Sequence, residues 1–279
     1  MSKYFRRLTS VAYSWMYVLW IYLRVGCRFW RWRIRLWLQQ LHIAESTHTG
    51  MKQTLLFIRH GQTTWNAEQK LPGQLPGIGL NEKGRKQVAD LAEALSAIPI
   101  SAIISSPLER ACETAEILAQ GRNLTIQLEP ALMDTDVGRW AGQNYEGLYK
   151  IDPDWKAYIK DPTVAPEGIE TFPQVQQRAL AAVERWRTQE AIGAYPAFVA
   201  HADVVKLLIA YYLGLDAGKA SRLFIDNASV SLVEIDKENI HPLRVVAISW
   251  NPHPGWLKPT ILEHQKDEIP VQPNGEQKT

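Results

Sequence analysis

Cysteine is scarce in this chain of 279 residues, which contains only Cys27 and Cys112. Two cysteines so far apart supply neither the paired spacing of a zinc site nor the bridges of a disulfide-rich extracellular domain. The sequence also lacks a Walker-type Gly-rich loop and a carboxylate cluster suited to magnesium. These absences predict a reducing, cytoplasmic location, and they imply no metal and no nucleotide cofactor.

Acidic residues are nearly missing from residues 1–50, where eight lysines and arginines stand against the single acid Glu45. Because the whole chain has a formal charge of +2 and this segment carries +7, the remaining residues carry −5. A mildly acidic remainder gives no indication of nucleic-acid binding.

A hydrophobic run long enough to span a membrane is also missing near the start. Residues 8–23 carry no charge, but a membrane-spanning helix needs about 20 apolar residues, and no small-residue cleavage site follows. Residues 24–38 then alternate arginines with tryptophan and aliphatic residues, which suits the headgroup zone of an anionic membrane. Two interpretations stay open: residues 1–45 form a membrane-surface anchor, or residues 1–50 are an over-extended gene start before Met51.

Residues 51–250 alternate short apolar runs with amphipathic stretches. The apolar runs predict strands at residues 54–58, 101–105, 126–128 and 197–200, and near a sheet edge at 228–235 and 243–249. The amphipathic stretches predict helices at residues 81–98, 107–120, 171–191 and 202–213, and in pieces, broken near Pro153, at 144–160. Strands that alternate with helices predict a three-layer α/β/α sandwich with a mostly parallel central sheet. The polar, Pro-rich residues 251–279 predict a disordered tail.

The first apolar run ends abruptly in Arg59-His60-Gly61. Open α/β sheets bind ligands at the carboxyl ends of their strands. An imidazole beside a guanidinium there suits attack on a phosphoryl group whose oxygens the guanidinium holds. A lone histidine after a strand is more often a turn residue, so this interpretation depends on what the other strand ends contribute.

Two further strand ends carry matching side chains. Arg110 lies in the first turn of the helix that follows residues 101–105, and His201 directly follows residues 197–200. Two guanidiniums and two imidazoles at one sheet edge make a pocket for a dianion, because the guanidinium fork matches phosphate oxygens in a way that lysine cannot. The start of the helix near Pro107 adds a positive dipole.

Together these residues resemble the histidine phosphatase superfamily, also called the phosphoglycerate mutase-like family. The resemblance covers about residues 54–250 and looks closest to a bacterial branch of phosphomutases and phosphatases. It rests on three motifs in order: Arg59-His60-Gly61-Gln62-Thr63-Thr64-Trp65-Asn66, then Ser105 to Ala115 with Arg110 and Thr114, then His201 at a strand end.

The resemblance implies roles for individual residues. His60 would be the nucleophile that becomes phosphorylated. Six further positions would hold the phosphoryl group and substrate: Arg59, Gly61, Asn66, Arg110, His201 and Ala202.

The leaving oxygen also needs a proton donor. The family often places a glutamate in a Glu-x-x-x-Gly-x-Trp-x-Gly stretch, and in this chain Asp134 takes its place, one methylene shorter. Asp136 and Asp203 compete for the role, although a helix cap or an ion pair with a pocket arginine also accounts for them.

We therefore expect a metal-independent phosphomonoester hydrolase that acts on a small phosphorylated metabolite through a phosphohistidine. Two alternatives remain open. The first is a phosphomutase of the phosphoglycerate mutase type, which returns the phosphoryl group to its product. The second is a non-catalytic phosphate- or phosphoprotein-binding module tethered to a membrane.

Overall fold

The computed structural model describes residues 52–236 and 242–253. The predicted membrane-surface segment at residues 1–45, and residues 254–279 of the predicted tail, lie outside the described residues. The folded domain extends past residue 250, because Asn251 is buried and its Nδ2 donates to Asp226 Oδ2 at 3.3 Å. None of the helices in the described part of the chain has the length and apolar character that a membrane span requires.

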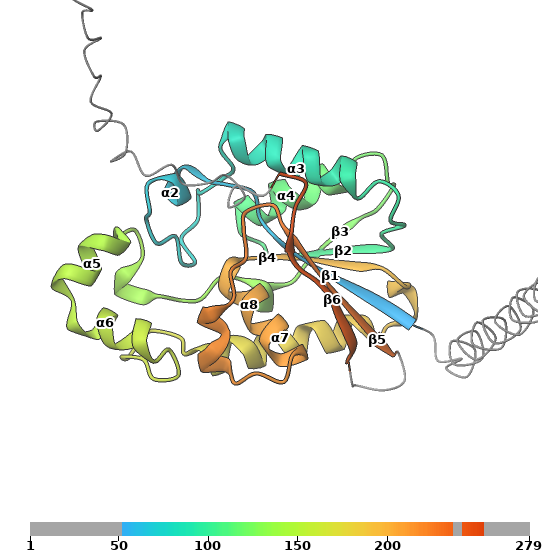
Figure 1. Ribbon diagram of the computed structural model, residues 1–279. Coiled ribbons are helices and arrows are strands. Elements are labelled where there is room, and N and C mark those ends of the chain that lie inside the picture. The colour runs from blue at the N-terminus through green and yellow to red at the C-terminus, as the bar shows by residue number, and fades with distance from the viewer. Residues whose placement is uncertain (1–51, 237–241, 254–279) are drawn as a thin grey trace, which may run out of the picture. The chain divides into compact units, whose positions relative to one another are not determined.

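In the described residues, six strands form one mixed sheet in the order β3-β2-β4-β1-β5-β6 (Figure 1). The strands are β1 (Lys52–Arg59), β2 (Ala102–Ser105), β3 (Ile126–Leu128), β4 (Pro196–Ala200), β5 (Val230–Asp236) and β6 (Pro242–Trp250). Strands β3, β2, β4 and β1 run parallel, whereas β5 is antiparallel to β1 and β6 to β5. The prediction of a mostly parallel sheet with its last two strands at one edge is confirmed.

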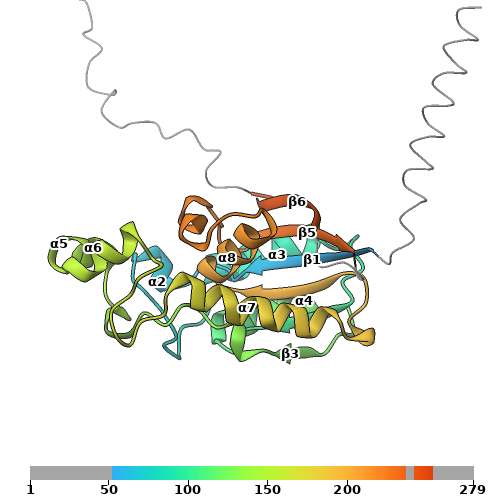
Figure 2. The same ribbon diagram turned by 90° about the horizontal axis from the view of Figure 1, so that it is seen from below.

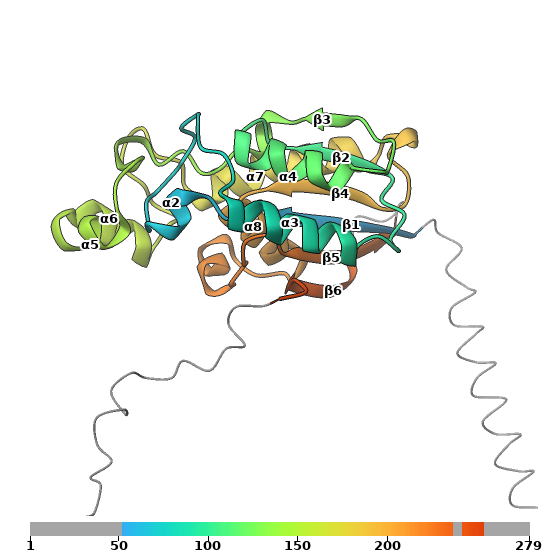
Figure 3. The same ribbon diagram turned by 90° about the horizontal axis from the view of Figure 1, so that it is seen from above.

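Helices cover both faces of this sheet, so the predicted three-layer sandwich is also confirmed. The α-helices are α2 (Thr64–Ala67), α3 (Glu82–Ala94), α4 (Glu109–Ala119), α5 (Tyr145–Ile151), α6 (Pro153–Lys160), α7 (Phe172–Arg187) and α8 (Ala202–Tyr212). Short 3₁₀ helices are η1 (Pro130–Leu132), η2 (Gly138–Trp140), η3 (Glu190–Ile192) and η4 (Ala217–Arg222). Helices α7 and α8 lie on one face (Figure 2), and α3 and α4 lie on the other (Figure 3).

Strand β1 shows why its sequence is a continuous apolar run. Successive side chains of a strand point to opposite faces. Leu55 and Phe57 therefore pack in the core under α7 and α8, while Leu56 and Ile58 pack in the core under α3 and α4. All four side chains are fully buried, and each contributes about 1.5–3 kcal/mol of burial free energy.

Local capping places the helix starts, and one prediction was wrong by two residues. Pro107 does not open α4: Leu108 is the N-cap, because the Ser106 hydroxyl accepts from the Leu108 N–H at 3.3 Å and holds these residues in a turn. The predicted break near Pro153 is confirmed. Asp152 ends α5 and caps α6, in which Pro153 occupies the first turn.

Candidate active site

The carboxyl ends of β1, β2 and β4 meet at one edge of the sheet. Arg59 is the last residue of β1, and His60 follows it; His201 follows β4 and is the N-cap of α8. The imidazole centroids of His60 and His201 lie 5.2 Å apart. The predicted convergence of residues far apart in the sequence is therefore present in the fold.

His60 is almost completely buried and has a defined orientation. Its Nδ1 lies 2.7 Å from the Gly61 carbonyl oxygen, which can only accept, so Nδ1 carries the hydrogen and Nε2 keeps its lone pair. Burial, followed by the nearby guanidiniums of Arg59 and Arg110, holds the pKa of His60 well below its usual range. The imidazole is thus neutral, and its Nε2 keeps the electron pair that a nucleophile needs.

Arg110 reaches back from the first turn of α4 with its side chain fully buried. Its Nη2 donates to the Gly73 carbonyl at 2.7 Å and to Asp134 Oδ2 at 3.2 Å. Arg59 Nη1 donates to the Ile225 carbonyl at 2.7 Å. Among the described residues, Arg110 Nε and Nη1 and Arg59 Nε are buried donors that find no protein acceptor. Such unpaired cationic donors fit a group rich in acceptor oxygens, as a phosphoryl group is.

His201 lies fully buried beside these arginines. Its Nε2 is 2.8 Å from Ser106 Oγ, and its Nδ1 is 3.7 Å from Asp134 Oδ2. Burial, followed by the charges of Arg110 and the other basic neighbours, holds the pKa of His201 well below its usual range. His201 is therefore neutral, like His60.

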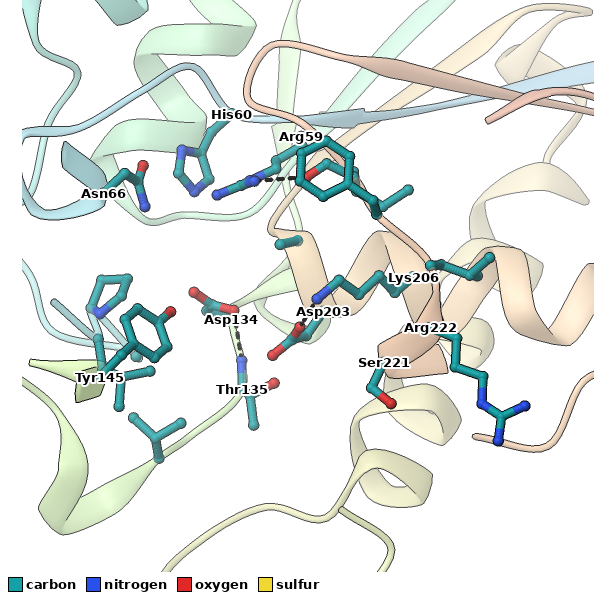
Figure 4. Close-up of a pocket in the computed structure, with 18 residues that line it drawn as sticks. Arg59, His60, Asn66, Asp134, Thr135, Tyr145, Asp203, Lys206, Ser221 and Arg222 are labelled. Atoms are coloured by element: carbon teal, nitrogen blue, oxygen red, sulfur yellow. Dashed lines mark hydrogen bonds and ion pairs between the residues drawn. The ribbon is translucent and has the colours of Figure 1, made fainter. Parts of the chain in front are cut away.

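Asp134 projects into the same space (Figure 4). Burial raises the pKa of its carboxyl group; Arg110 opposes this shift, and Asp203 adds to it. A carboxyl group with a raised pKa keeps its proton to higher pH, as a proton donor must.

The two competing acids are placed differently. Asp136 is exposed and its Oδ1 accepts from the Gly138 N–H at 3.0 Å. Asp203 lines the cavity in the first turn of α8, where its Oδ1 pairs with Lys206 Nζ at 2.9 Å, a lysine and not the predicted arginine. Asp134 contacts both Arg110 and His201, so the geometry favours it as the acid.

The three remaining predicted residues have distinct positions. Gly61 does not line the cavity: its N–H donates to Thr114 Oγ1 at 3.2 Å, and its carbonyl holds His60. Asn66 lines the cavity while its Oδ1 accepts from the Thr63 N–H in the capping box of α2. Ala202 lines the cavity as the first residue of α8, whose N-cap makes no side-chain hydrogen bond, so the positive end of this helix faces the site.

A cavity of about 370 Å³ is lined by Arg59, His60, Asn66, Asp134 and Ala202 (Figure 4). Arg110 and His201 do not line it; both are buried in contact with Asp134. The wall also contains residues that were not predicted as site residues: Tyr145, Lys206, Ser221, Arg222 and Phe224. Tyr145 begins α5, and the last three lie at the end of η4 and just after it. No sequence motif marks the η4 segment as part of the site, because its residues lie beside the other site residues only once the chain is folded.

Arg178 supports Asp134 from α7 and was also missed. Its guanidinium donates to the carbonyl oxygens of Ala131, Met133 and Asp134, each at 2.8 Å, and pairs with Glu170. These bonds fix the backbone that carries the Asp134 carboxyl group. Arg178 lies 44 residues from Asp134, too far for a local pattern to reveal the contact.

An α/β sandwich that gathers two arginines and two histidines at one sheet edge is built to hold a phosphoryl group. The sequence profile of the histidine phosphatase superfamily (branch 1) matches residues 55–247, and the chain belongs to this superfamily.

The similar proteins include one named as a phosphoglycerate mutase and one named as a phosphatase. The chain is 32% identical over 202 residues to the bifunctional protein Rv2228c of Mycobacterium tuberculosis, covering 71% of this chain and 54% of that protein, so it spans about half the length of this relative. It is 33% identical over 180 residues to the probable phosphoglycerate mutase GpmB of Cronobacter sakazakii, covering 63% and 82%. The structure matches the mycobacterial glucosyl-3-phosphoglycerate phosphatase in complex with VO3 with a TM-score of 0.60 and 30% identity, covering 65% and 92%. Phosphatases and mutases both transfer a phosphoryl group.

Proposed function

We propose that this protein is a metal-independent phosphomonoester hydrolase that acts on a small phosphorylated metabolite through a phosphohistidine at His60. One observation carries the proposal. The neutral imidazole of His60, the Arg59 guanidinium and the Asp134 carboxyl group with its raised pKa line one cavity. The buried Arg110 guanidinium, which has two unpaired donors, contacts this carboxyl group. This set meets the needs of nucleophilic phosphoryl transfer.

In the first step, Arg59, Arg110 and His201 hold the phosphoryl oxygens. The lone pair of His60 Nε2 forms a bond to phosphorus while the bond from phosphorus to the leaving oxygen breaks. The leaving oxygen takes the proton of Asp134, so the alcohol departs neutral and Asp134 becomes a carboxylate. Donors aimed at the transferring group supply most of the rate because they need no reorganisation.

In the second step, a water molecule attacks the phosphohistidine. Asp134, now a carboxylate, takes a proton from that water while the new oxygen–phosphorus bond forms and the nitrogen–phosphorus bond breaks. Inorganic phosphate leaves, His60 returns as a neutral imidazole, and Asp134 returns in its protonated form.

The alternative is a mutase, which transfers the phosphoryl group of His60 to a second hydroxyl instead of water. The similarity to a probable phosphoglycerate mutase favours it. Hydrolysis is supported by the similarity to a named phosphatase and by the absence of a lysine- or arginine-rich insertion between the motifs.

The test separates both activities from binding alone. The full chain is incubated with sugar phosphates, phosphoglycolate and nucleoside monophosphates, and released phosphate is measured. In parallel, 3-phosphoglycerate primed with bisphosphoglycerate is assayed for isomerisation. We expect phosphate release that His60→Ala abolishes. Isomerisation without phosphate release would replace the proposal by the mutase. Phosphate release that His60→Ala leaves unchanged would not come from this site, and the site would then be one that binds phosphate without turnover.

A further inference from the structure

The imidazole of His201 has one N–H hydrogen in its neutral form. The neighbours of its two ring nitrogens determine which nitrogen carries that hydrogen. Nε2 faces Ser106 Oγ at 2.8 Å. Nδ1 has no hydrogen-bond partner among the described residues and points toward Asp134 Oδ2, 3.7 Å away. Ser106 and His201 are fully buried, so bulk water does not compete for the contact between them.

The Ser106 hydroxyl favours one of the two tautomers by what it can still donate. Its oxygen already accepts from the Leu108 N–H at 3.3 Å, at the start of α4. In the part of the chain that the structure describes, its other hydrogen bond is the one to His201 Nε2. If Nε2 carried the hydrogen, Ser106 would accept twice and its own buried hydrogen would have no acceptor.

We infer that Ser106 is a positioning residue: its hydroxyl donates to Nε2 of His201 and thereby places the imidazole hydrogen on Nδ1, toward Asp134 and the phosphoryl oxygens. The inference rests on the proposed function for what Nδ1 meets there. The neutral form of His201, which its lowered pKa favours, is the form in which this choice exists.

The choice matters because of the charge that Nδ1 faces. A hydrogen on Nδ1 donates to an anionic phosphoryl oxygen or to the carboxylate that Asp134 becomes. In the other tautomer, the Nδ1 lone pair would face these same oxygens and repel them. Because donation to an oxyanion strengthens as charge develops, the loss should appear in turnover more than in substrate binding.

The test compares Ser106→Ala with Ser105→Ala in the full chain. Ser105 is an adjacent, equally buried serine whose hydroxyl donates to the Ser106 carbonyl at 2.9 Å and does not contact His201. Both proteins are labelled with ¹⁵N-histidine, and long-range ¹H–¹⁵N spectra report which nitrogen carries hydrogen. His201→Gln assigns the His201 signals. Turnover of p-nitrophenyl phosphate gives kcat and KM.

We expect the Nδ1–H tautomer of His201 in the parent and in Ser105→Ala, and a shift toward Nε2–H in Ser106→Ala. In Ser106→Ala, kcat should fall about 10- to 100-fold, the size of effect seen when the partner that orients a metal-bound imidazole is removed, with KM changed less than about threefold. An Nε2–H tautomer in the parent would overturn the inference. The spectra need no turnover, so they judge Ser106 even if the protein proves not to be a hydrolase.

Discussion

At the scale of single residues, His60 and His201 differ in which ring nitrogen has a hydrogen-bond partner. His60 Nδ1 is tied to a backbone carbonyl, which leaves a lone pair on Nε2 for attack. His201 Nε2 meets a serine hydroxyl, which leaves Nδ1 to donate. In the proposed reaction, the same side chain therefore serves as a nucleophile in one position and as a hydrogen-bond donor in the other.

Asp134→Asn should lower kcat on alkyl phosphates about 10²- to 10⁴-fold, because an amide cannot protonate the leaving alkoxide. The loss should be much smaller for p-nitrophenyl phosphate, whose phenolate leaves without needing a proton. Asp136→Asn and Asp203→Asn are the matched controls and should show no such dependence on the leaving group. Steady-state kinetics on both substrates measures the contrast; an equal loss on both would assign Asp134 a structural role.

The pH profile should follow the two opposite pKa shifts. His60 must be neutral, and its lowered pKa keeps it so at pH values where an ordinary histidine is charged. Asp134 must be protonated, and its raised pKa extends the range in which it is. We expect kcat/KM to stay high on the acidic side of neutrality and to fall as pH rises through the pKa of Asp134. The falling limb should disappear in Asp134→Asn with p-nitrophenyl phosphate.

The main residues of the site were predictable from sequence because of one geometric rule. Arg59 ends strand β1, and His60 and His201 directly follow β1 and β4, parallel strands whose carboxyl ends meet at one edge. The contacts of Arg178 and the packing role of Gly61 were not predictable. They depend on partners many residues away, and no local periodicity records such contacts.

At the scale of elements, the close approach of α3 to the loop after His60 depends on two glycines. A Cβ on Gly61 would lie 2.7 Å from the Gly84 carbonyl oxygen, and a Cβ on Gly84 would lie 2.0 Å from the Gln62 carbonyl oxygen. Both contacts are with backbone, which cannot move aside as a flexible side chain can. Helix α3 therefore packs directly against Gly61 and Gln62, the residues that follow His60.

Gly84→Ala should destabilise the fold by about 1–3 kcal/mol or more through overpacking, and it should lower kcat by moving Gln62 and the neighbouring His60. Gly147→Ala is the matched control on α5. Gly147 is exposed, its added Cβ would meet nothing closer than 4.0 Å, and alanine is the better helix former by about 0.5–1 kcal/mol. Urea unfolding of both variants measures the difference. Equal stabilities of the two variants would show that α3 can shift away from the loop after His60 at little energetic cost.

Element boundaries were harder to predict than element types. The alternation of strands and helices was predictable, because strands buried on both faces are apolar runs and the helices that cover them are amphipathic. The start of α4 was not predictable, because a hydrogen bond from the Leu108 backbone N–H to the Ser106 hydroxyl accompanies a helix start two residues after Pro107.

At the scale of the whole molecule, the site makes the fold sensitive to acid. Two neutral histidines are buried among guanidiniums, and both have pKa values lowered by folding. A lowered pKa contributes stability that is present above the unfolded-state value, about 6.5, and is lost as pH falls through the folded-state value. The fold therefore keeps both imidazoles neutral near pH 7 and loses stability in acid.

The free energy of unfolding should fall by up to about 1.4 kcal/mol per pH unit for each of these histidines below about pH 6.5. His201→Gln removes one of these histidines and should reduce the slope by up to about 1.4 kcal/mol per pH unit. Urea titrations between neutral and mildly acidic pH measure both slopes. Identical slopes in the parent and the variant would contradict a lowered pKa for His201.

The central claim is that side chains from three strand ends converge so that His60 is loaded covalently. The most direct measurement is rapid quenching of the full chain during turnover of a ³²P-labelled phosphomonoester. Mass spectrometry under alkaline conditions, which preserve phosphohistidine, then locates the label. We expect acid-labile phosphate on His60, absent in His60→Ala and longer-lived in Asp134→Asn. Turnover with no label on His60, or with label on another residue, would contradict it.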